Sequence, residues 1–312
     1  MSYLSDAAVS RLRGIANWPE LASSRYVVVE ELGRGGMGTV YLARDQELGR
    51  DVALKISNAI ASPGVEERLR QEARTLARLE HPGIVPIHDV GRLADGRLFY
   101  VMKRLEGQTL RERLPSLPRS ERLTTFERIC EPVAFAHSHG VVHRDLKPAN
   151  IMLGGFGEVV VLDWGLAKAA DQDASGAVAG THGYMAPEQA GGGAAVDHRA
   201  DVYALGAILH ELLTNAVPSA SDSSAAIRAG DVPRPLAAIC QAALRRDPAE
   251  RYQSVAAMRD DVARYRAGST VSVYRETVGE RIGRFTRTYR TAILLVLAYL
   301  VMRTLVALFA GW

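Results

Sequence analysis

The chain has 312 residues, of which 47% are hydrophobic and 23% charged, so it can bury the core of one large domain or of two lobes. Its formal net charge is +3, but residues 275–312 alone carry +4, which leaves −1 on residues 1–274 and gives no basis for nucleic-acid binding. Two cysteines exclude a disulfide framework and favour a reducing compartment, and residues 1–20 lack the apolar core of a secretory signal.

The first part of the chain is predicted to be rich in strands. Residues 1–24 form a polar lead-in. Runs of β-branched and aromatic residues, separated by turn residues, indicate strands over 26–29, 39–43, 52–56, 84–90 and 98–102. Apolar residues at helical spacing predict one helix over 65–79, and a proline at position 82 would stop it.

The second part is predicted to be helical. Apolar spacing indicates helices over 110–114, 124–139, 202–213, 236–245 and 255–265. Strands followed by helices predict an α+β, two-lobed domain over 25–267. We place its β-rich N-lobe over 25–102 and its α-helical C-lobe over 107–267.

A glycine-rich segment joins the first two predicted strands. It reads GRGGMGTV over residues 33–40, with glycine at the first, third and sixth positions. Glycine lets the backbone approach a polyphosphate because no Cβ stands in the way. Dinucleotide-binding folds need a helix after such glycines, whereas here Val40 continues a strand. The segment alone is a weak signal, since a flexible hairpin explains it about as well.

Lys55 ends an apolar run that reads VALK. A lysine in such a strand is either an edge charge or a phosphate ligand that needs a partner. Glu72, on the following predicted helix, is the natural partner, because a Lys–Glu pair would hold the ammonium toward the α- and β-phosphates. Taken singly, each residue is more often on the surface than in a site.

The strongest chemical signal reads HRDLKPAN over residues 143–150. Asp145 offers a carboxylate that can accept a hydroxyl proton, Lys147 offers charge near a migrating phosphoryl group, and Asn150 offers an amide oxygen to Mg²⁺. The triplet DWG then follows the apolar run 159–162, so that a strand would deliver Asp163 as a second metal ligand. Phosphoryl transfer depends on charge neutralisation and in-line positioning, which these groups supply.

In this order and at this spacing, the segments resemble those of the eukaryotic-like (Hanks-type) serine/threonine protein kinases of the bacterial membrane-anchored type. The resemblance covers about 26–265. It extends to GTHGYMAPE over 180–188, similar to the end of the family's activation loop, and to DVYALG over 201–206, similar to the helix beneath the catalytic loop. Arg251 resembles the arginine that pairs with Glu188.

The resemblance implies ATP and Mg²⁺ as cofactors and a role for each matching residue. Asp145 would act as the base, Lys147 would steady the γ-phosphate, and Met102 would be the gatekeeper before a hinge over 103–105. The residues expected in catalysis are Asp145, Lys147, Lys55, Glu72 and Thr181. Those expected to hold Mg²⁺ are Asn150 and Asp163. Those expected around ATP are Leu32, Gly33, Arg34, Gly35, Gly36, Met37, Gly38, Val40, Ala53, Lys55, Met102, Lys103, Arg104, Leu105, Asn150 and Asp163.

Two features of the resemblance imply transfer to serine or threonine hydroxyls of a protein substrate. Lys147 stands where tyrosine-directed members usually place other residues, and Thr181 stands where serine/threonine-directed members bridge the catalytic Asp and Lys. Sugar and antibiotic phosphotransferases share a related lobe plan, but Arg144 and the APE run at 186–188 argue against them. Two alternatives from other classes are a pseudokinase, which would normally lose a catalytic residue, and a membrane-tethered adaptor.

The chain departs from the family pattern in three places. Trp164 replaces the usual phenylalanine, and its larger ring is expected to resist the flip seen in some inactive kinases. Residues 163–188 hold hydroxyls only at Ser175, Thr181 and Tyr184, which makes Ser175 the expected site of an autophosphorylation by self-association. The segment 213–236 is shorter than the family usually has, which bears on the choice of partner.

The C-terminal residues 291–312 predict a membrane-spanning helix. As a helix they would rise about 33 Å, enough to cross a bilayer. Arg303 opposes insertion by about 2.5–3.5 kcal/mol, whereas eleven Leu, Ile, Val and Phe residues favour it by about 3–7 kcal/mol. Insertion is therefore favoured by a narrow margin.

Residues 268–290 form a basic juxtamembrane segment before that helix. Four arginines recur there every third residue, which suits an anionic membrane surface: Arg281, Arg284, Arg287 and Arg290. Positive residues beside the span predict a single-pass protein of the inner (cell) membrane with a cytoplasmic kinase domain. The alternative is a soluble cytoplasmic protein whose last helix packs on the kinase domain or self-associates.

Overall fold

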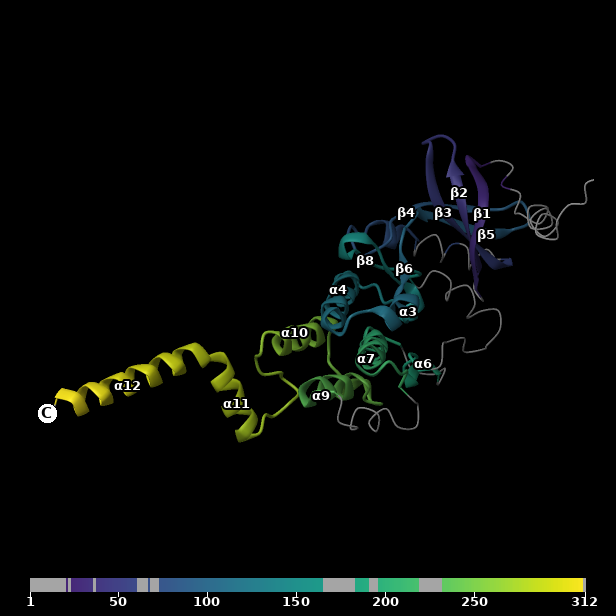
Figure 1. The fold of residues 1–312 in the computed structure, drawn as a ribbon. Helices are drawn as coiled ribbons and strands as arrows, with labels where there is room; N and C mark the ends of the chain where they lie inside the picture. The colour runs from purple at the N-terminus through teal and green to yellow at the C-terminus, as the bar shows by residue number, and fades with distance from the viewer. Residues whose placement is uncertain are drawn as a thin grey trace, which may run out of the picture.

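The computed structural model describes residues 21, 24–35, 38–60, 67, 73–164, 183–190, 196–218 and 232–310. Strands gather at the N-terminal end of the molecule, helices form a second lobe, and two further helices run away from that lobe toward the C-terminus (Figure 1). The predicted α+β architecture with a β-rich N-lobe and a helical C-lobe is confirmed.

The N-lobe is a five-stranded antiparallel sheet with the strand order β1-β2-β3-β5-β4. Its strands are β1 (Tyr26–Gly35), β2 (Gly38–Asp45), β3 (Arg50–Ile60), β4 (Ile87–Arg92) and β5 (Arg97–Lys103). Successive side chains of a strand point to opposite faces of the sheet. The sheet therefore has two faces of different character.

One face carries its own apolar cluster, and the other faces the C-lobe. The residues of the first face are Tyr26, Val28, Tyr41, Ala43, Val52, Leu54, Ile56, Leu93, Phe99 and Val101. On the second face, Ala53 lies opposite Met102 and Lys55 lies opposite Tyr100 in the β3–β5 register. Ala53, Tyr100 and Met102 belong to the larger core that continues into the C-lobe. The sheet thus directs Lys55 toward the boundary between the lobes.

The predicted helix over 65–79 is described only in part. Residues 73–77 are helical, and Ala73, Leu76 and Leu79 are buried in the larger core, as the apolar spacing predicts. Glu72, the predicted partner of Lys55, lies outside the described residues.

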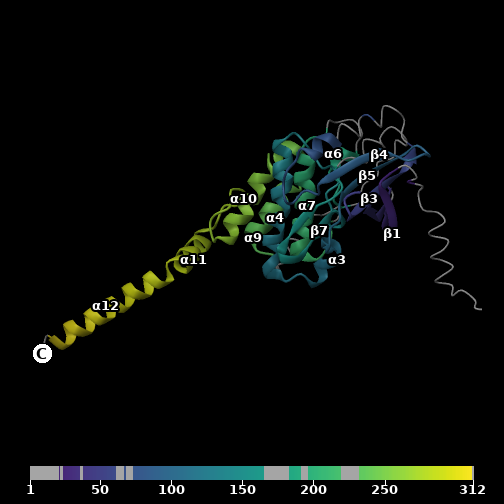
Figure 2. The same cartoon turned by 90° about the horizontal axis from the view of Figure 1, so that it is seen from above.

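The C-lobe is built around α7 (Arg199–Thr214), a helix with eleven buried residues. It packs against α4 (Arg119–Ser138), α9 (Arg234–Ala243) and α10 (Val255–Arg266), and Figure 2 shows these four helices grouped in one lobe. The shorter helices are α3 (Leu110–Arg113) and α6 (Pro187–Ala190). Short 3₁₀ turns cover Leu114–Ser116, Pro148–Asn150, Gly155–Gly157 and Pro248–Glu250. Helix α7 is therefore the central helix of the C-lobe.

A small second sheet carries the predicted catalytic segment. Its strands β6 (Gln108–Thr109), β7 (Ile151–Leu153) and β8 (Val159–Val161) pair in the order β6-β7-β8. The segment HRDLKPAN runs directly into β7, and Asp163 follows β8. Because β7 and β8 are antiparallel neighbours, the start of one and the end of the other meet at the same edge of the sheet. Asn150 and Asp163 are brought together in this way.

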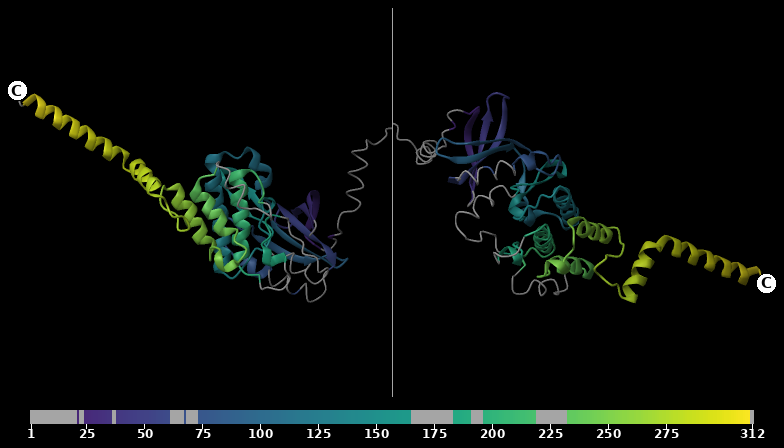
Figure 3. Two further views of the ribbon diagram at one scale, coloured as in Figure 1. Left: turned by 90° about the horizontal axis from the view of Figure 1, so that it is seen from below. Right: turned by 180° about the vertical axis from the view of Figure 1, so that it is seen from behind.

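The chain ends in an arm of two helices, α11 (Val278–Thr288) and α12 (Arg290–Ala310), which extends away from the C-lobe in both views of Figure 3. The side chains of α12 from Leu294 to Val306 include ten exposed large apolar groups: Leu294, Leu295, Val296, Leu297, Tyr299, Leu300, Val301, Met302, Leu305 and Val306.

Among the helices that the structure describes, none has the length and apolar character needed to cross a membrane. The predicted span over 291–312 is therefore not confirmed. Within this segment Arg303 is the residue that opposes a span, because a charged side chain is costly in the hydrocarbon core of a bilayer.

Candidate active site

A cavity of about 790 Å³ lies between the two lobes. Both sheets contribute to its wall, together with the segment that follows β5. Its lining residues are Leu32, Gly33, Arg34, Gly35, Gly38, Val40, Ala53, Lys55, Val85, Met102, Lys103, Leu105, Thr109, Asp145, Lys147, Ala149, Asn150, Met152, Leu162 and Asp163. Residues far apart in the sequence are thus brought to one cavity of the size of a nucleotide site.

The three motif glycines differ in what surrounds them. A Cβ added at Gly38 would collide with the backbone carbonyl of Ile56, because β2 and β3 pair closely at this point. At Gly33 an added Cβ would meet no described atom within 4 Å, and at Gly35 the nearest one lies at 3.9 Å. Glycine at 38 is required by the sheet, whereas the packing of the described residues does not require it at 33 and 35. The open space there fits a ligand that the backbone approaches closely.

Lys55 and Asp163 form a close ion pair on the inner face of the N-lobe. Lys55 Nζ lies 2.6 Å from Asp163 Oδ1, and the lysine side chain is only 7% exposed. Asp163 has a left-handed backbone with a φ of 56°, a conformation that non-glycine residues seldom adopt. Such strain is common at functional sites, where the surrounding structure holds it in place.

The catalytic segment brings together the carboxylate of Asp145, the ammonium of Lys147 and the amide of Asn150. Lys147 Nζ donates to Asp145 Oδ2 at 2.9 Å. Asn150 Nδ2 donates to the Asp145 carbonyl at 2.8 Å and to Asp145 Oδ2 at 3.2 Å. Both bonds use the amide nitrogen of Asn150, which leaves its oxygen as the group for a cation. Magnesium prefers oxygen ligands from carboxylates and carbonyls, so Asn150 and Asp163 fit a Mg²⁺ ion.

Asp201 at the start of α7 fixes the backbone of this segment. Its carboxylate accepts the N–H groups of His143 and Arg144, each at 2.8 Å, and its Oδ2 lies 2.8 Å from His137 Nε2. Burial alone raises the pKa of Asp201, but the contacts with His137 and His143 outweigh burial and hold that pKa below its ordinary value. The buried carboxylate therefore stays ionised and holds a backbone in which Arg144 has a φ of 66°.

Trp164 directly follows Asp163 and is buried in the larger core, with 2% of its surface exposed. Its indole Nε1–H donates to the Val161 carbonyl at 3.0 Å, and its ring lies 4.9 Å from the ring of His143. His143 Nε2 in turn lies 2.8 Å from the Leu162 carbonyl. An indole can donate this hydrogen bond and a phenylalanine cannot, so Trp164 combines a buried apolar ring with one polar contact to the backbone.

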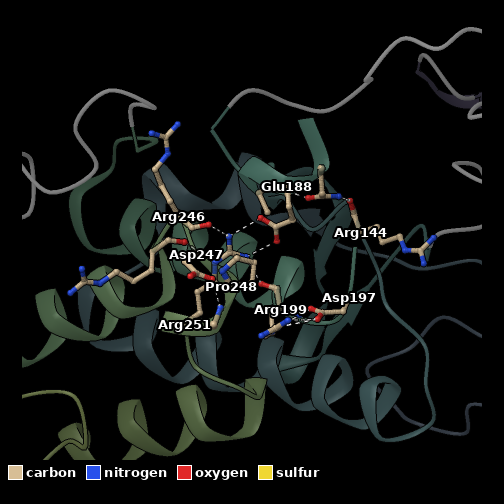
Figure 4. Close-up of polar contacts among 12 residues, drawn as sticks. Arg144, Glu188, Asp197, Arg199, Arg246, Asp247, Pro248 and Arg251 are labelled. Carbon is tan, nitrogen blue, oxygen red and sulfur yellow. Dashed lines mark hydrogen bonds and ion pairs between the residues drawn. The ribbon is translucent and has the colours of Figure 1, made fainter. Parts of the chain in front are cut away.

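A buried ion pair joins Glu188 on α6 to Arg251, which follows the 3₁₀ turn Pro248–Glu250. Arg251 Nη1 and Nη2 each lie 2.7 Å from an oxygen of Glu188, and the arginine also donates to the Arg199 carbonyl at 2.9 Å. Figure 4 shows the two side chains facing each other, with the side chain of Arg144 turned away from Glu188. Gln189 Nε2 donates to the Arg144 carbonyl at 2.8 Å and so joins α6 to the catalytic segment. The pairing of Glu188 with Arg251 agrees with the resemblance.

Most of the predicted site residues within the described ranges line the one cavity. Arg104 does not: its guanidinium lies 2.9 Å from the carboxylate of Asp51 on β3. Glu72, Gly36, Met37, Thr181 and Ser175 lie outside the described residues.

Five residues that line the cavity were not predicted as site residues from the sequence: Val85, Thr109, Ala149, Met152 and Leu162. Only Ala149 and Leu162 had a signal, because each adjoins a predicted metal ligand in the sequence.

Known proteins with similar sequences are protein kinases. A family model described as "Protein kinase domain" matches residues 26–263. The serine/threonine-protein kinase PknB of Mycolicibacterium smegmatis is 41% identical over 278 residues, which cover 80% of this chain and 44% of that protein. The serine/threonine-protein kinase PknD of Protochlamydia amoebophila is 35% identical over 301 residues, which cover 80% of this chain and 30% of that protein. This chain therefore spans less than half the length of these curated relatives.

A solved structure gives the same result. The crystal structure of a double mutant of the Mycobacterium tuberculosis PknI kinase domain aligns with a TM-score of 0.64 at 29% sequence identity. The alignment covers 79% of this chain and 97% of that domain.

Proposed function

This chain belongs to the protein kinase family, and we propose that it is a serine/threonine protein kinase that transfers the γ-phosphate of ATP to hydroxyl groups of a protein. One observation carries the proposal. The carboxylates of Asp145 and Asp163 and the ammonium groups of Lys55 and Lys147 all line the cavity between the lobes. This combination of charges suits a polyphosphate, a divalent cation and a hydroxyl group that must lose its proton.

Each residue has one task in this proposal. Lys55 binds phosphate oxygens, and Asn150 and Asp163 hold Mg²⁺, which when bound neutralises charge on the phosphates. Asp145 accepts the proton of the attacking hydroxyl. Lys147, 2.9 Å from Asp145, lies where it can steady the transferred group without blocking the second oxygen of that carboxylate. The residues around ATP are those predicted from the sequence, with Arg104 lying outside the cavity lining.

Phosphate transfer from ATP in the presence of Mg²⁺ tests the activity. We expect Asp145→Ala and Lys55→Met to lower the turnover at least about a hundredfold, since each removes a charge from the reacting centre. Asp95→Ala is the matched control, because Asp95 lies in the β4–β5 turn and pairs with Arg97 at 2.7 Å. Equal turnover in the wild-type chain and in both site variants would contradict the proposal and leave the pseudokinase alternative.

The acceptor is proposed to be serine or threonine, because Lys147 and Thr181 match the serine/threonine-directed pattern. Phosphoamino-acid analysis of a modified substrate protein tests this. Detection of phosphotyrosine alone would contradict it. Ser175 is the proposed site of autophosphorylation between two copies, and a Ser175→Ala chain that keeps the same phosphate content after incubation with ATP would exclude that site.

The C-terminal arm is proposed to attach the kinase to a lipid bilayer, with the kinase domain on the cytoplasmic side. The support is the row of exposed apolar side chains on α12, since a helix that is apolar all round needs an apolar environment. Surface attachment of this kind does not require a complete span. Flotation with vesicles of mixed neutral and anionic lipid tests it: we expect the full chain to float and a chain ending at Thr277 to stay at the bottom.

A further inference from the structure

Tyr100 reaches the same carboxylate as Lys55. In the β3–β5 register the two residues lie directly opposite each other, so their side chains leave the same face of the sheet. Both are buried, with exposed fractions of 5% for Lys55 and 8% for Tyr100. A tyrosine at this place has a polar hydroxyl that needs a partner inside the lobe.

That partner is Asp163. The hydroxyl of Tyr100 lies 3.4 Å from Asp163 Oδ1, the oxygen that also lies 2.6 Å from Lys55 Nζ. The ammonium of Lys55 lies 5.8 Å from the centre of the Tyr100 ring, within the range of a cation–π contact. A phenol carries its proton at neutral pH, so the hydroxyl of Tyr100 is the donor and the carboxylate of Asp163 the acceptor of this contact.

The two donors differ in rigidity. A lysine side chain has four flexible bonds and follows the group that it binds, whereas a tyrosine has two torsions and a ring packed in the core. The ring therefore fixes the position of its hydroxyl, and the hydroxyl limits the rotation of the carboxylate that it contacts. Asp163 needs such a restraint, because it stands in a left-handed backbone and its side chain is 33% exposed.

We propose that Tyr100 is a positioning residue for the metal-binding carboxylate: with Lys55 it holds Asp163 Oδ1 and so turns Asp163 Oδ2 toward Mg²⁺. This inference rests on the proposed kinase function. In the simplest alternative, Tyr100 only fills the core behind the gatekeeper. The two roles predict different effects of a substitution. A ring that only fills the core affects stability, whereas a positioning hydroxyl affects the concentration of Mg²⁺ that nucleotide binding requires.

The test uses the full-length chain in mild detergent and a fluorescent, non-hydrolysable ATP analogue, titrated with Mg²⁺. Tyr100→Phe removes the hydroxyl and keeps the ring. We expect it to need about three- to tenfold more Mg²⁺ for tight binding, the effect of one lost hydrogen bond of ordinary strength, since the contact of 3.4 Å is long. Binding without Mg²⁺ and the thermal midpoint without nucleotide should stay unchanged.

Two further variants separate the hydroxyl from the packing. Tyr41→Phe is the matched control, since Tyr41 is also buried in the N-lobe, at 7% exposure, but lies in the cluster on the opposite face of the sheet. It should behave as the wild type. Tyr100→Leu also removes the ring and should lower the thermal midpoint in addition to raising the Mg²⁺ requirement.

The outcomes are distinct. A wild-type chain whose binding of the analogue does not respond to Mg²⁺ would contradict the proposed function itself. A wild-type chain that responds, together with an unchanged or lowered Mg²⁺ requirement in Tyr100→Phe, would overturn only the role of Tyr100. An equal loss of binding with and without Mg²⁺ would overturn it as well, because the hydroxyl would then act on the nucleotide pocket.

Discussion

At the scale of single residues, the glycine-rich segment separates the demands of the fold from those of the ligand. Gly38 is enclosed by the backbone of β3, whereas no atom of the described residues lies within 4 Å of a Cβ added at Gly33. A methyl group should therefore act on different properties at these two positions. At Gly38 it should act on folding, and at Gly33 on nucleotide binding.

We expect Gly33→Ala to leave the thermal midpoint unchanged or slightly raised, since an alanine restricts the unfolded chain by about 0.4–1 kcal/mol. Its KM for ATP should rise severalfold, because the methyl group would occupy the space proposed for the phosphates. Gly38→Ala should lower the thermal midpoint, because its Cβ meets the Ile56 carbonyl. Thermal melts and ATP titrations of both variants check this, and equal KM values for Gly33→Ala and the wild type would contradict it.

Trp164 is a second residue whose effect follows from one bond. Its indole N–H holds the Val161 carbonyl at 3.0 Å, so turning the ring out of its pocket breaks a buried hydrogen bond. Trp164→Phe removes that bond, which contributes about 0.5–1.5 kcal/mol. We expect inhibitors that require the flipped ring to bind the variant about two- to tenfold more tightly than the wild type, as measured by calorimetry. Equal affinities would show that the bond does not resist the flip.

His143 predicts how stability depends on pH. It is fully buried, its Nε2 donates to the Leu162 carbonyl, and its Nδ1 accepts the Asp145 N–H at 3.2 Å. Burial lowers its pKa, so on acidification the unfolded chain takes up a proton before the folded one does. The stabilisation of the folded chain by neutral His143 is fully present above the pKa of about 6.5 that a histidine has in the unfolded chain. It is lost as the pH falls below that value.

We therefore expect the urea midpoint to fall between pH 7.5 and pH 5.5. The fall should be smaller in His143→Asn, which cannot take up the proton. It should not vanish, because burial also lowers the pKa of His81, His88 and His210. A variant with the same pH slope as the wild type would exclude His143 as a contributor.

At the scale of elements, Arg251 joins several pieces of the C-lobe. Besides Glu188 on α6, it binds the carbonyl of Arg199 on α7 and that of Arg245 in the segment after α9. Its side chain is fully buried, so removing it leaves the Glu188 carboxylate without its charge partner (Figure 4). Breaking a buried ion pair in this way costs about 3–5 kcal/mol.

We expect Arg251→Met to lower the free energy of unfolding by about that amount and to reduce the activity, since α6 also holds the catalytic segment through Gln189. Arg245→Met is the matched control. Its side chain is 60% exposed and its guanidinium lies 4.0 Å from the carboxylate of Glu250, so its loss should change stability by less than about 1 kcal/mol. Urea unfolding followed by fluorescence measures both, and similar values for the two variants would contradict the prediction.

The elements also show what a sequence can and cannot predict. Runs of β-branched and aromatic residues indicated the five strands of the N-lobe, and apolar residues at helical spacing indicated the long helices of the C-lobe, because these elements bury apolar side chains. The motifs indicated that Lys55, Asp145 and Asp163 share a site, because their chemistry requires a common ligand. Both inferences use local pattern and known chemistry.

Arg122 and Tyr100 could not be predicted in this way. Arg122 lies in α4 before the predicted start of that helix, yet it is buried and donates to the Leu212 carbonyl at 2.6 Å. Its partner is 90 positions away in the sequence, and nothing in the local pattern distinguishes it from a surface arginine. Tyr100 fits a strand whether or not its hydroxyl meets a carboxylate. Contacts of this kind depend on how the elements pack.

At the scale of the whole molecule, the packing of the kinase domain continues beyond the end of α10. Asp261 is fully buried, and it accepts the Ser272 hydroxyl at 2.6 Å and the Ser272 N–H at 2.9 Å. Val271 is buried in the core of the C-lobe. Further on, Glu280 accepts the Thr277 N–H and caps α11. The segment between α10 and α11 therefore belongs to the packing of the C-lobe, and the arm begins after it.

Two truncations should separate the domain from the arm. A chain that ends at Thr277 keeps Val271 and Ser272, whereas one that ends at Ala267 loses both. The shorter chain loses the burial of a valine, about 1.5–3 kcal/mol, and leaves buried Asp261 without two of its donors. We expect it to be less stable than the longer one by about 2–4 kcal/mol.

Both truncated chains should fail to float with vesicles, because both lack α11 and α12. The chain ending at Thr277 should keep the full turnover with ATP, since no residue of the arm lines the cavity between the lobes. Urea unfolding and flotation of the same two proteins thus measure different parts of the molecule. Equal stabilities of the two chains would mean that the contacts of Ser272 and Val271 do not stabilise the domain. Flotation of either chain would show that the lipid-binding surface lies on the domain and not on the arm.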